Sequence, residues 1–136
     1  MAIAPVNTRA AKKIDLPSIE SIQASSPEAS HWYAQDYFAY NLIVAEIENE
    51  VVGFLCWREI AGEGEILNLA VLPTHRRQGI AKVLLQQIPK LERVFLEVRA
   101  SNKAAITLYM SHGFRVSGKR LKYYSDPEED AVVMIL

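Results

Sequence analysis

The chain has 136 residues, half of them hydrophobic, which is enough for one substantial core, and we expect a single domain over residues 1–136. The 15 lysines and arginines are balanced by 16 acidic residues, so the sequence lacks the basic character of proteins that bind nucleic acid non-specifically. No apolar run reaches the ~18 residues of a membrane-spanning helix, and we expect no signal peptide. Cys56 is the only cysteine and lies in an apolar stretch. We therefore expect a buried free thiol in a cytoplasmic protein, with neither nucleic acid nor membrane as a partner.

The first part of the chain predicts a weak edge strand and two helices. The strand signal covers residues 6–10, and the first helix is expected over residues 16–24, with Asp15 as its cap. Aromatic side chains, among them Trp32, crowd residues 31–40. They predict either a second helix packed in the core or the wall of a substrate cleft.

The middle of the chain alternates between strand and helix patterns. A hairpin and a third antiparallel strand come first, followed by a basic loop that leads into a helix. The next strand should lie parallel to the third, because a strand, a helix and a strand form a crossover. These elements are expected at residues 42–47, 51–57, 65–72, 80–88 and 94–98.

The C-terminal part predicts one more helix and two more strands. Asn102 can cap the helix and Gly113 can end it. A strand is expected to start at residues 114–116, and a closing strand is expected at residues 131–136, with a polar segment between them. The sequence therefore predicts a mixed α/β sheet with helices on both faces.

The basic loop before the helix of residues 80–88 has the properties of a phosphate site. A helix start presents backbone N–H groups without partners and a partial positive charge, and Arg76 and Arg77 stand beside it. Gly79 has no Cβ, so a pyrophosphate can approach the backbone there. An ordinary basic helix cap would show the same residues. The flanking sequence must therefore decide between the two interpretations.

That flanking sequence resembles a known family. The pattern Arg76-x-x-Gly79-x-Ala81 resembles the acyl-CoA pyrophosphate motif of the GNAT superfamily of N-acyltransferases. Further strings resemble one branch of it, the RimI-type ribosomal-protein-alanine N-acetyltransferases, in the correct order from Glu65 to Leu136. These strings are Asn68-Leu69-Ala70-Val71, Leu96-Glu97-Val98-Arg99-Ala100-Ser101-Asn102, Leu108-Tyr109 to Gly113-Phe114, Lys122-Tyr123-Tyr124 and Glu129-Asp130-Ala131.

The resemblance implies a GNAT fold whose sheet is mostly antiparallel, with a parallel central pair that splays at the acyl-CoA site. It implies direct transfer of an acetyl group from acetyl-CoA to an amine through a tetrahedral intermediate. The pantetheine would pair with the exposed backbone as an added strand does, and a backbone N–H nearby would serve the oxyanion. The cofactor-binding residues implied are Leu69, Ala70, Val71, Arg76, Arg77, Gln78, Gly79, Ile80, Ala81, Lys82 and Asn102. For Asn102, a cap alone is the alternative.

Two residues match the family's catalytic pair, Glu97 as proton acceptor and Tyr109 as proton donor. A carboxylate of pKa ~4.3 is a poor base for an ammonium of pKa ~8, by roughly 5 kcal/mol. We therefore expect Glu97 to act through a water or in a dry cleft. The alternative interpretations are a charge on the outer face of the strand for Glu97 and a core aromatic for Tyr109. A covalent route through Cys56 lacks a recognisable base partner.

The resemblance also implies the acceptor. It favours the N-terminal α-amine of a protein with a small first residue, such as a ribosomal protein, in a pocket shaped by Trp32, Tyr123 and Tyr124. An enzyme acting on a small amine or a lysine side chain remains open, as does an acyl-CoA-binding module without turnover. The presence of both catalytic residues argues against the module.

Two departures from the family pattern concern length. The segments that follow Gly79 and Trp32 both look shorter than in the family, and the second shortening leaves the acceptor open. No metal is expected either, because His31, His75 and His112 lack the spacing of a metal site.

Overall fold

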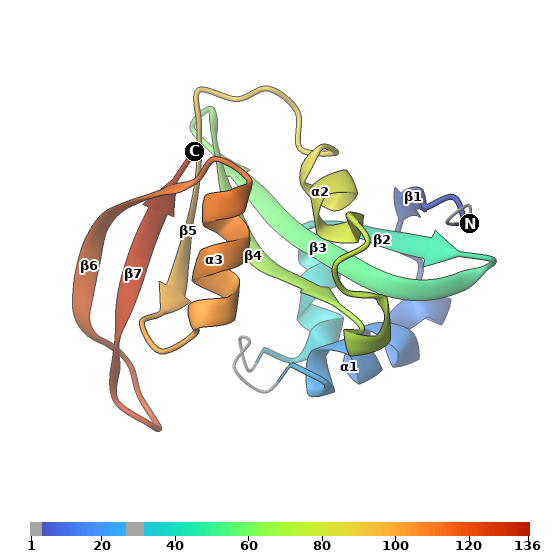
Figure 1. The fold of residues 1–136 in the computed structure, drawn as a ribbon, viewed down its shortest axis with the longest axis horizontal. Coiled ribbons are helices and arrows are strands. Elements are labelled where there is room, and N and C mark those ends of the chain that lie inside the picture. Colours follow the sequence, from blue (N-terminus) through green and yellow to red (C-terminus); the bar gives the residue numbers. More distant parts are fainter. Residues whose placement is uncertain (1–3, 27–31) are drawn as a thin grey trace. The chain divides into compact units, whose positions relative to one another are not determined.

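The computed structural model describes residues 4–26 and 32–136, and Figure 1 shows its fold. Seven strands form one sheet in the order β1-β2-β3-β4-β5-β7-β6, mostly antiparallel with one parallel pair. This confirms the predicted mixed α/β fold. The chain groups into two compact units, Met1–Arg58 with Leu67–Pro89, and Glu59–Ile66 with Lys90–Leu136. The single domain over residues 1–136 stays a prediction.

The first unit contains the hairpin predicted for residues 42–57. The weak strand signal near the start is confirmed by an antiparallel pair between β1 and β2. The elements that begin in residues 1–89 are β1 (Asn7–Ala10), η1 (Lys13–Asp15), α1 (Leu16–Ala24), η2 (Ala34–Ala39), β2 (Asn41–Ile47), β3 (Glu50–Ile60), β4 (Glu63–Val71), η3 (Pro73–His75) and α2 (Ile80–Leu85).

The first helix matches its predicted bounds, but its cap does not work as expected. Asp15 occupies the N-cap position of α1 without a side-chain hydrogen bond to the helix. Its carboxylate instead accepts hydrogen bonds from the backbone of Lys12, at 2.8 Å, and from the guanidinium of Arg9, at 2.8 and 2.9 Å. The short 3-10 turn η1 explains the difference, because Asp15 closes that turn rather than opening α1.

The aromatic segment forms a shorter element than predicted. A 3-10 helix, η2, replaces the expected second α-helix, and His31 lies outside the described residues. Tyr37 is fully buried, and its ring centroid lies 5.5 Å from that of Phe54. The segment is therefore anchored by aromatic packing on β3, and a six-residue 3-10 helix suffices to do this.

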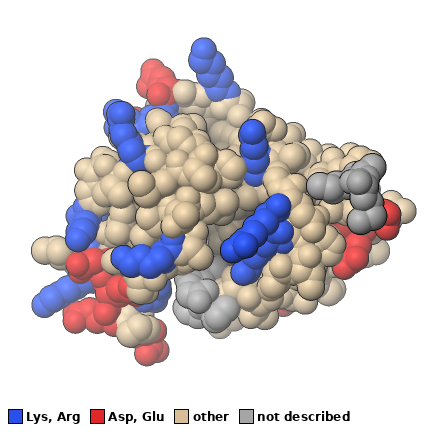
Figure 2. Space-filling model, in the orientation of Figure 1, with Lys and Arg blue, Asp and Glu red and all other residues tan. Residues whose placement is uncertain are grey.

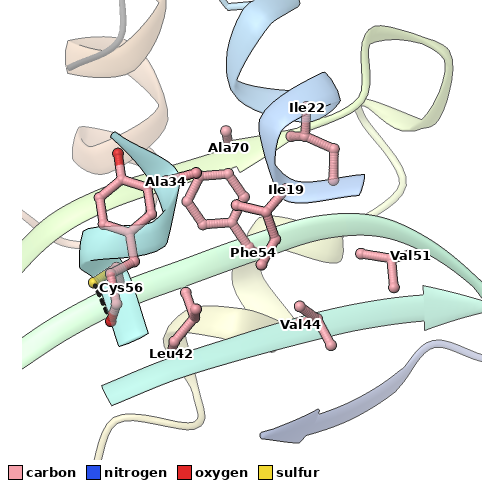
Figure 3. Close-up of a cluster of buried hydrophobic side chains, with 10 residues drawn as sticks. Ile19, Ile22, Ala34, Leu42, Val44, Val51, Phe54, Cys56 and Ala70 are labelled. Atoms are coloured by element: carbon pink, nitrogen blue, oxygen red, sulfur yellow. Dashed lines mark hydrogen bonds between the residues drawn. The ribbon is translucent and has the colours of Figure 1, made fainter. Parts of the chain in front are cut away.

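In the first unit, helices cover both faces of the sheet, as predicted. Successive side chains of a strand point to opposite faces. Phe54 and Cys56 of β3 lie in a buried cluster with residues of α1 and η2, shown in Figure 3. Gly53, the neighbour of Phe54 in the strand, points to the opposite face and toward α2: a Cβ built there would lie 3.4 Å from a methyl group of Ile80 and 3.1 Å from the carbonyl oxygen of Ala70.

The helix α2 ends earlier than expected. The sequence predicted a helix as far as residue 88, where Pro89 would stop it, but α2 ends at Leu85. The next two turns are closed by tighter bonds, from the Gln87 N–H to Leu84 at 3.0 Å and from the Ile88 N–H to Leu85 at 3.2 Å. Proline limits how far a helix can run, but it does not fix where the α-helical bonding gives way to 3-10 turns.

The second unit carries the parallel pair. The first residues of β4 pair in parallel with β5, from Glu63 and Arg93 to Ile66 and Leu96, which confirms the predicted crossover. Asn102 caps α3, accepting a hydrogen bond from the Ala105 N–H at 3.1 Å. The remaining elements are β5 (Arg93–Arg99), α3 (Lys103–Ser111), β6 (Arg115–Tyr124) and β7 (Glu129–Ile135).

The strand β6 is much longer than predicted. The sequence indicated the start of a strand at residues 114–116 and a polar segment after it, whereas β6 runs from Arg115 to Tyr124 and stands at one end of the strand order. Nearly all of its residues are exposed, so it lacks the buried alternation that reveals a strand in a sequence. Lysines and arginines on such an edge discourage pairing with other chains. Because its residues are mostly polar and exposed, the strand looked like a polar segment in the sequence.

Candidate active site

The loop before α2 keeps the open space that a phosphate site needs. Gly79 is the N-cap of α2 in the left-handed region, at φ +80°, and a Cβ built on it would meet no atom within 4 Å. Arg77 also has a positive φ, +64°. Arg77, Gln78 and Lys82 expose their side chains. On the face shown in Figure 2 the basic side chains are scattered, and acidic side chains lie beside some of them, which agrees with the balanced net charge.

Arg76 makes two hydrogen bonds within the protein, and its contact with the cofactor stays a prediction. Its Nε donates a hydrogen bond to the carbonyl oxygen of Val71 at 3.1 Å, and its Nη2 donates to Ser26 Oγ at 3.0 Å. Two of its nitrogens therefore tie the loop to the end of β4 and to the segment after α1. Arg77 and Lys82 are the basic side chains better placed to meet an anion.

The three residues at the end of β4 differ in what their backbones offer. The N–H of Leu69 already donates to the side-chain oxygen of Asn68 at 2.9 Å. The N–H of Leu72 donates to Val52 of β3 at 2.8 Å. Since alternate N–H groups of a strand point to opposite edges, the N–H of Val71 points away from β3. The N–H of Val71 is therefore the candidate for the backbone donor at the oxyanion site, a role that stays a prediction.

A buried polar network lies beside these residues, and the sequence did not reveal it. Asn68 donates to the Tyr37 hydroxyl at 2.8 Å, and that hydroxyl donates to the side-chain oxygen of Gln23. The Gln23 amide nitrogen donates to the carbonyl of Trp32 at 2.6 Å. Burial raises the pKa of Tyr37 to about 12, so this hydroxyl keeps its proton at neutral pH. The one available signal was Asn68, a polar residue on a buried position of an apolar strand.

In the second unit, Glu97 lies on β5 with its side chain only 11% exposed. The Nε of Arg120 is 3.1 Å from Oε1 of this carboxylate. The other oxygen, Oε2, is buried and has no hydrogen-bond partner among the described residues. A buried oxygen without a partner carries a cost unless it binds water or a ligand. This favours a functional site over a solvated surface charge.

Tyr123 and Tyr124 lie next to this carboxylate. Their rings meet edge to face with centroids 5.1 Å apart, and burial is the main reason that the pKa values of both hydroxyls are raised, that of Tyr124 to about 12. Hydrogen bonding to Glu97 raises the pKa of Tyr123 further, and the charge of Glu97 raises the pKa values of both tyrosines. The guanidinium of Arg120 lies 5.6 Å from the Tyr123 ring and that of Arg99 lies 4.5 Å from the Tyr124 ring.

Tyr109 and Asn102 belong to α3 and its start. Tyr109 is 6% exposed, with its ring 5.4 Å from that of Phe114, so it packs as the core alternative expected. Burial raises the pKa of its hydroxyl well above the usual value, which keeps the proton on the phenol. Asn102 acts as a cap, as described above. Their roles toward a thiolate and a cofactor stay predictions.

The predicted residues thus fall into two groups. Leu69, Ala70, Val71, the loop of residues 76–82 and Trp32 belong to the first unit. Glu97, Asn102, Tyr109, Tyr123 and Tyr124 belong to the second, where Glu97 and the two adjacent tyrosines come together. Sequence reasoning missed Arg120 as the partner of Glu97, because an arginine in a polar segment looks like any solvated charge.

Other candidate chemistries find little support. Cys56 is fully buried, and burial raises the pKa of its thiol to about 12, so a reactive thiolate does not form at neutral pH. Over residues 4–26 and 32–136, no three His, Cys, Asp or Glu side chains gather as metal ligands would. None of the helices described is long and apolar enough to cross a membrane.

The sheet has one parallel pair, and its strand β4 is followed by a basic loop and by a helix that begins at a glycine. This is the arrangement that the resemblance implied for the class of acyl-CoA-dependent acyltransferases. The family model described as acetyltransferase (GNAT) family matches residues 12–114. The chain belongs to this family.

Individual relatives narrow the comparison to the branch that the sequence resembled. The [ribosomal protein bS18]-alanine N-acetyltransferase of Escherichia coli strain K12 is 40% identical over 95 residues, which cover 64% of this chain and 64% of that protein. The enzyme of the same name from Salmonella typhimurium is 33% identical over 135 residues, 90% of each chain. The crystal structure of the Escherichia coli enzyme superposes with a TM-score of 0.77 at 28% identity, covering 97% of this chain and 93% of that one. The resemblance to this branch is confirmed.

Proposed function

We propose that this protein transfers an acetyl group from acetyl-CoA to the N-terminal α-amine of a protein whose first residue is small, such as alanine. The observation that carries the proposal is the Glu97 carboxylate, with one oxygen paired to Arg120 and the other buried without a partner among the described residues. Such an oxygen is suited to accept a proton from an amine or a water. The names of the two relatives support an acceptor of the ribosomal-protein type.

The roles follow from the chemistry of acyl transfer. The amine nitrogen attacks the thioester carbon, the carbon–sulfur bond breaks, and the amine proton passes through a water to Glu97. The N–H of Val71 stabilises the oxyanion, and Tyr109 donates a hydrogen bond to the departing thiolate. The backbone of the loop at residues 77–82, with Arg77 and Lys82, holds the pyrophosphate.

The remaining parts of the proposal concern the acceptor pocket, the pantetheine, the domain and the cellular compartment. Trp32, Tyr123 and Tyr124 border the first side chain of the acceptor. The backbone of residues 69–71 carries the pantetheine. Residues 1–136 act as one catalytic domain, in the cytoplasm, where acetyl-CoA and newly made proteins are both present.

The direct test uses acetyl-CoA and peptides that differ only in residue one. We expect release of free CoA with peptides that begin with Ala or Ser, and mass spectrometry should place the acetyl group on the N-terminus. Glu97→Gln keeps the size of the side chain and should lose most of the turnover while still binding acetyl-CoA. Binding of acetyl-CoA without acetylation of any peptide, lysine or small amine would replace the proposal with a non-catalytic module.

A further inference from the structure

The network of Asn68, Tyr37 and Gln23 runs without a break from β4 to Trp32. Its hydrogen bonds all point the same way, because Asn68 donates to Tyr37, Tyr37 to Gln23, and Gln23 to the carbonyl of Trp32. At its other end the Asn68 side chain accepts from the N–H of Leu69. Asn68 also donates to the side-chain oxygen of Gln23 over a longer distance, 3.4 Å. Every link has a defined donor and acceptor, so the bonds support one another in a single arrangement.

Trp32 is held by its ring as well as by its carbonyl. The rings of Trp32 and Tyr37 stack with centroids 6.1 Å apart and an interplanar angle of 23°, and Tyr40 lies against Trp32 at 6.3 Å. Trp32 remains 40% exposed, so part of its ring is free to contact a ligand. Tyr37 therefore fixes Trp32 twice, by stacking on the indole and through Gln23.

The same network fixes a strand residue that matters for the reaction. Asn68 is 8% exposed and precedes the three residues that the family resemblance assigns to the pantetheine. Its side-chain oxygen accepts the hydrogen bond that the Leu69 N–H donates. A change at Tyr37 therefore affects the β4 residues that the resemblance assigns to the pantetheine, through Asn68, and the position of Trp32, through Gln23.

We propose that Asn68, Tyr37 and Gln23 form a positioning network that sets the size of the first side chain the enzyme accepts, by holding Trp32 in place relative to β4. The proposal rests on the proposed function in one respect, that Trp32 borders the acceptor. A rigid aromatic wall excludes larger side chains, whereas a wall released from the network can move aside. Discrimination by a pocket of this kind is about 10- to 200-fold per methylene group, so small movements of Trp32 have measurable effects.

Two variants break the network at different links. Tyr37→Phe keeps the ring and its stacking but removes the central hydroxyl. Gln23→Glu keeps an acceptor for Tyr37 but replaces the donor to the Trp32 carbonyl with a carboxylate that repels it. The matched control is Tyr40→Phe, which removes a hydroxyl from the other ring against Trp32 and leaves the three hydrogen bonds intact.

Selectivity is the first readout. For each variant we would measure kcat/KM with peptides that begin with Ala and with Leu, along with the KM for acetyl-CoA and the melting temperature. We expect the preference for Ala over Leu to fall about tenfold in both network variants, with the KM for acetyl-CoA unchanged, and to remain at the wild-type value in Tyr40→Phe. Wild-type preference in a folded Tyr37→Phe protein would overturn the proposal.

Fluorescence gives a readout that does not depend on the acceptor. In a Trp57→Phe background Trp32 is the only tryptophan, since the chain has two. Both network variants should make Trp32 easier to quench with acrylamide, and Tyr40→Phe should not. If the wild-type protein acetylates no N-terminus but the quenching changes as expected, the proposed function fails and the network still holds Trp32. Unchanged quenching in both variants overturns the network itself.

Discussion

The Nε of Arg120 lies 3.1 Å from Oε1 of Glu97, which brings a cation from the exposed strand β6 onto the carboxylate of β5. The two side chains differ in exposure, 59% for Arg120 and 11% for Glu97. Arg120 also lies over the ring of Tyr123. The ion pair thus fixes the Glu97 side chain in one rotamer while Oε2 stays available for another partner.

Arg120→Ala should lower kcat about tenfold or more with little change in the KM for acetyl-CoA, because the carboxylate loses its orientation but the cofactor site is untouched. Arg120→Lys should restore part of the rate, since it keeps the charge without the planar fork. Lys119→Ala is the matched control. Lys119 pairs in register with Val132 while Arg120 pairs with Ala131, so its side chain points to the other face. Equal losses in the Arg120→Ala and Lys119→Ala variants would remove this role from Arg120.

Gly79→Val should weaken binding of acetyl-CoA at least tenfold, or ~1.4 kcal/mol, because its side chain would fill the open space beside the start of α2. The substitution also strains a backbone with φ +80°. Gly62→Val is the control for strain alone, since Gly62 has φ +84° in the turn between β3 and β4. Calorimetry on the two folded variants separates the effects. Wild-type affinity in Gly79→Val would discard this loop as the pyrophosphate site.

Tyr109→Phe should reduce kcat about 10- to 100-fold, the effect of losing one hydrogen bond to a charged group, with the KM for acetyl-CoA nearly unchanged. Burial raises the pKa of Tyr109, so we expect it to donate a hydrogen bond rather than release its proton early. The ring packing against Phe114 survives in the variant, and the melting temperature should change little. A variant with wild-type kcat in single-turnover experiments would leave Tyr109 as a core aromatic only.

Asp15 links the stability of the first unit to pH. The hydrogen bond from Arg9 holds the pKa of Asp15 below its usual value, so the carboxylate favours the folded state wherever it is ionised. The stabilisation is present above the unfolded pKa of ~3.9 and is lost as the pH falls through the lower folded pKa. Asp15→Asn should therefore lower the free energy of unfolding by about 2–3 kcal/mol at pH 7, with the difference shrinking below about pH 4. Asp36→Asn, at an exposed position, is the control in urea titrations at both pH values.

Periodicity predicted the elements whose buried faces alternate cleanly. Helix α1 and the parallel pair of β4 and β5 carry apolar residues at the spacing of their own structure, whereas β3 was predicted from a continuous apolar run that is buried on both faces. The strand β6 gave no such signal because both of its faces are largely exposed, and α2 gave a misleading one because apolar spacing continues past its last α-helical bond. The local sequence does not show at which residue the α-helical hydrogen bonds at the end of a helix give way to 3-10 hydrogen bonds.

Some residues of the candidate site could likewise be identified from the sequence, and others only from the structure. Gly79 and Glu97 could be singled out from the sequence because each stands in a contiguous motif. Arg120 and Glu97 come from different strands, and their contact depends on the register of β6, β7 and β5. Gln23, Tyr37 and Asn68 are likewise far apart in the chain. Pairing across elements requires the folded structure, so a single sequence without relatives could not reveal either set.

The choice of amine follows from proton arithmetic. A peptide α-amine of pKa ~7.8 is about a tenth neutral at pH 7, whereas a lysine side chain of pKa ~10.4 is neutral less than once in a thousand. That gap of ~2.6 units corresponds to roughly 3.5 kcal/mol, and a carboxylate acting through water does not close it. At pH 7 a far larger fraction of the α-amine is therefore neutral and able to react, so it is the favoured acceptor unless the site binds lysine specifically.

We predict that peptides beginning with Ala or Ser are acetylated at the N-terminus, and that the same peptides, blocked there and carrying an internal lysine, are not. The rate should rise between about pH 6.5 and 8.5, as the neutral fraction of the α-amine grows. A peptide with a free N-terminus and the same lysine is the matched control, with mass spectrometry locating each acetyl group. Acetylation of the lysine at a rate comparable to the N-terminus would favour a lysine or small-amine acceptor, because proton loss from the α-amine would then not be deciding the substrate.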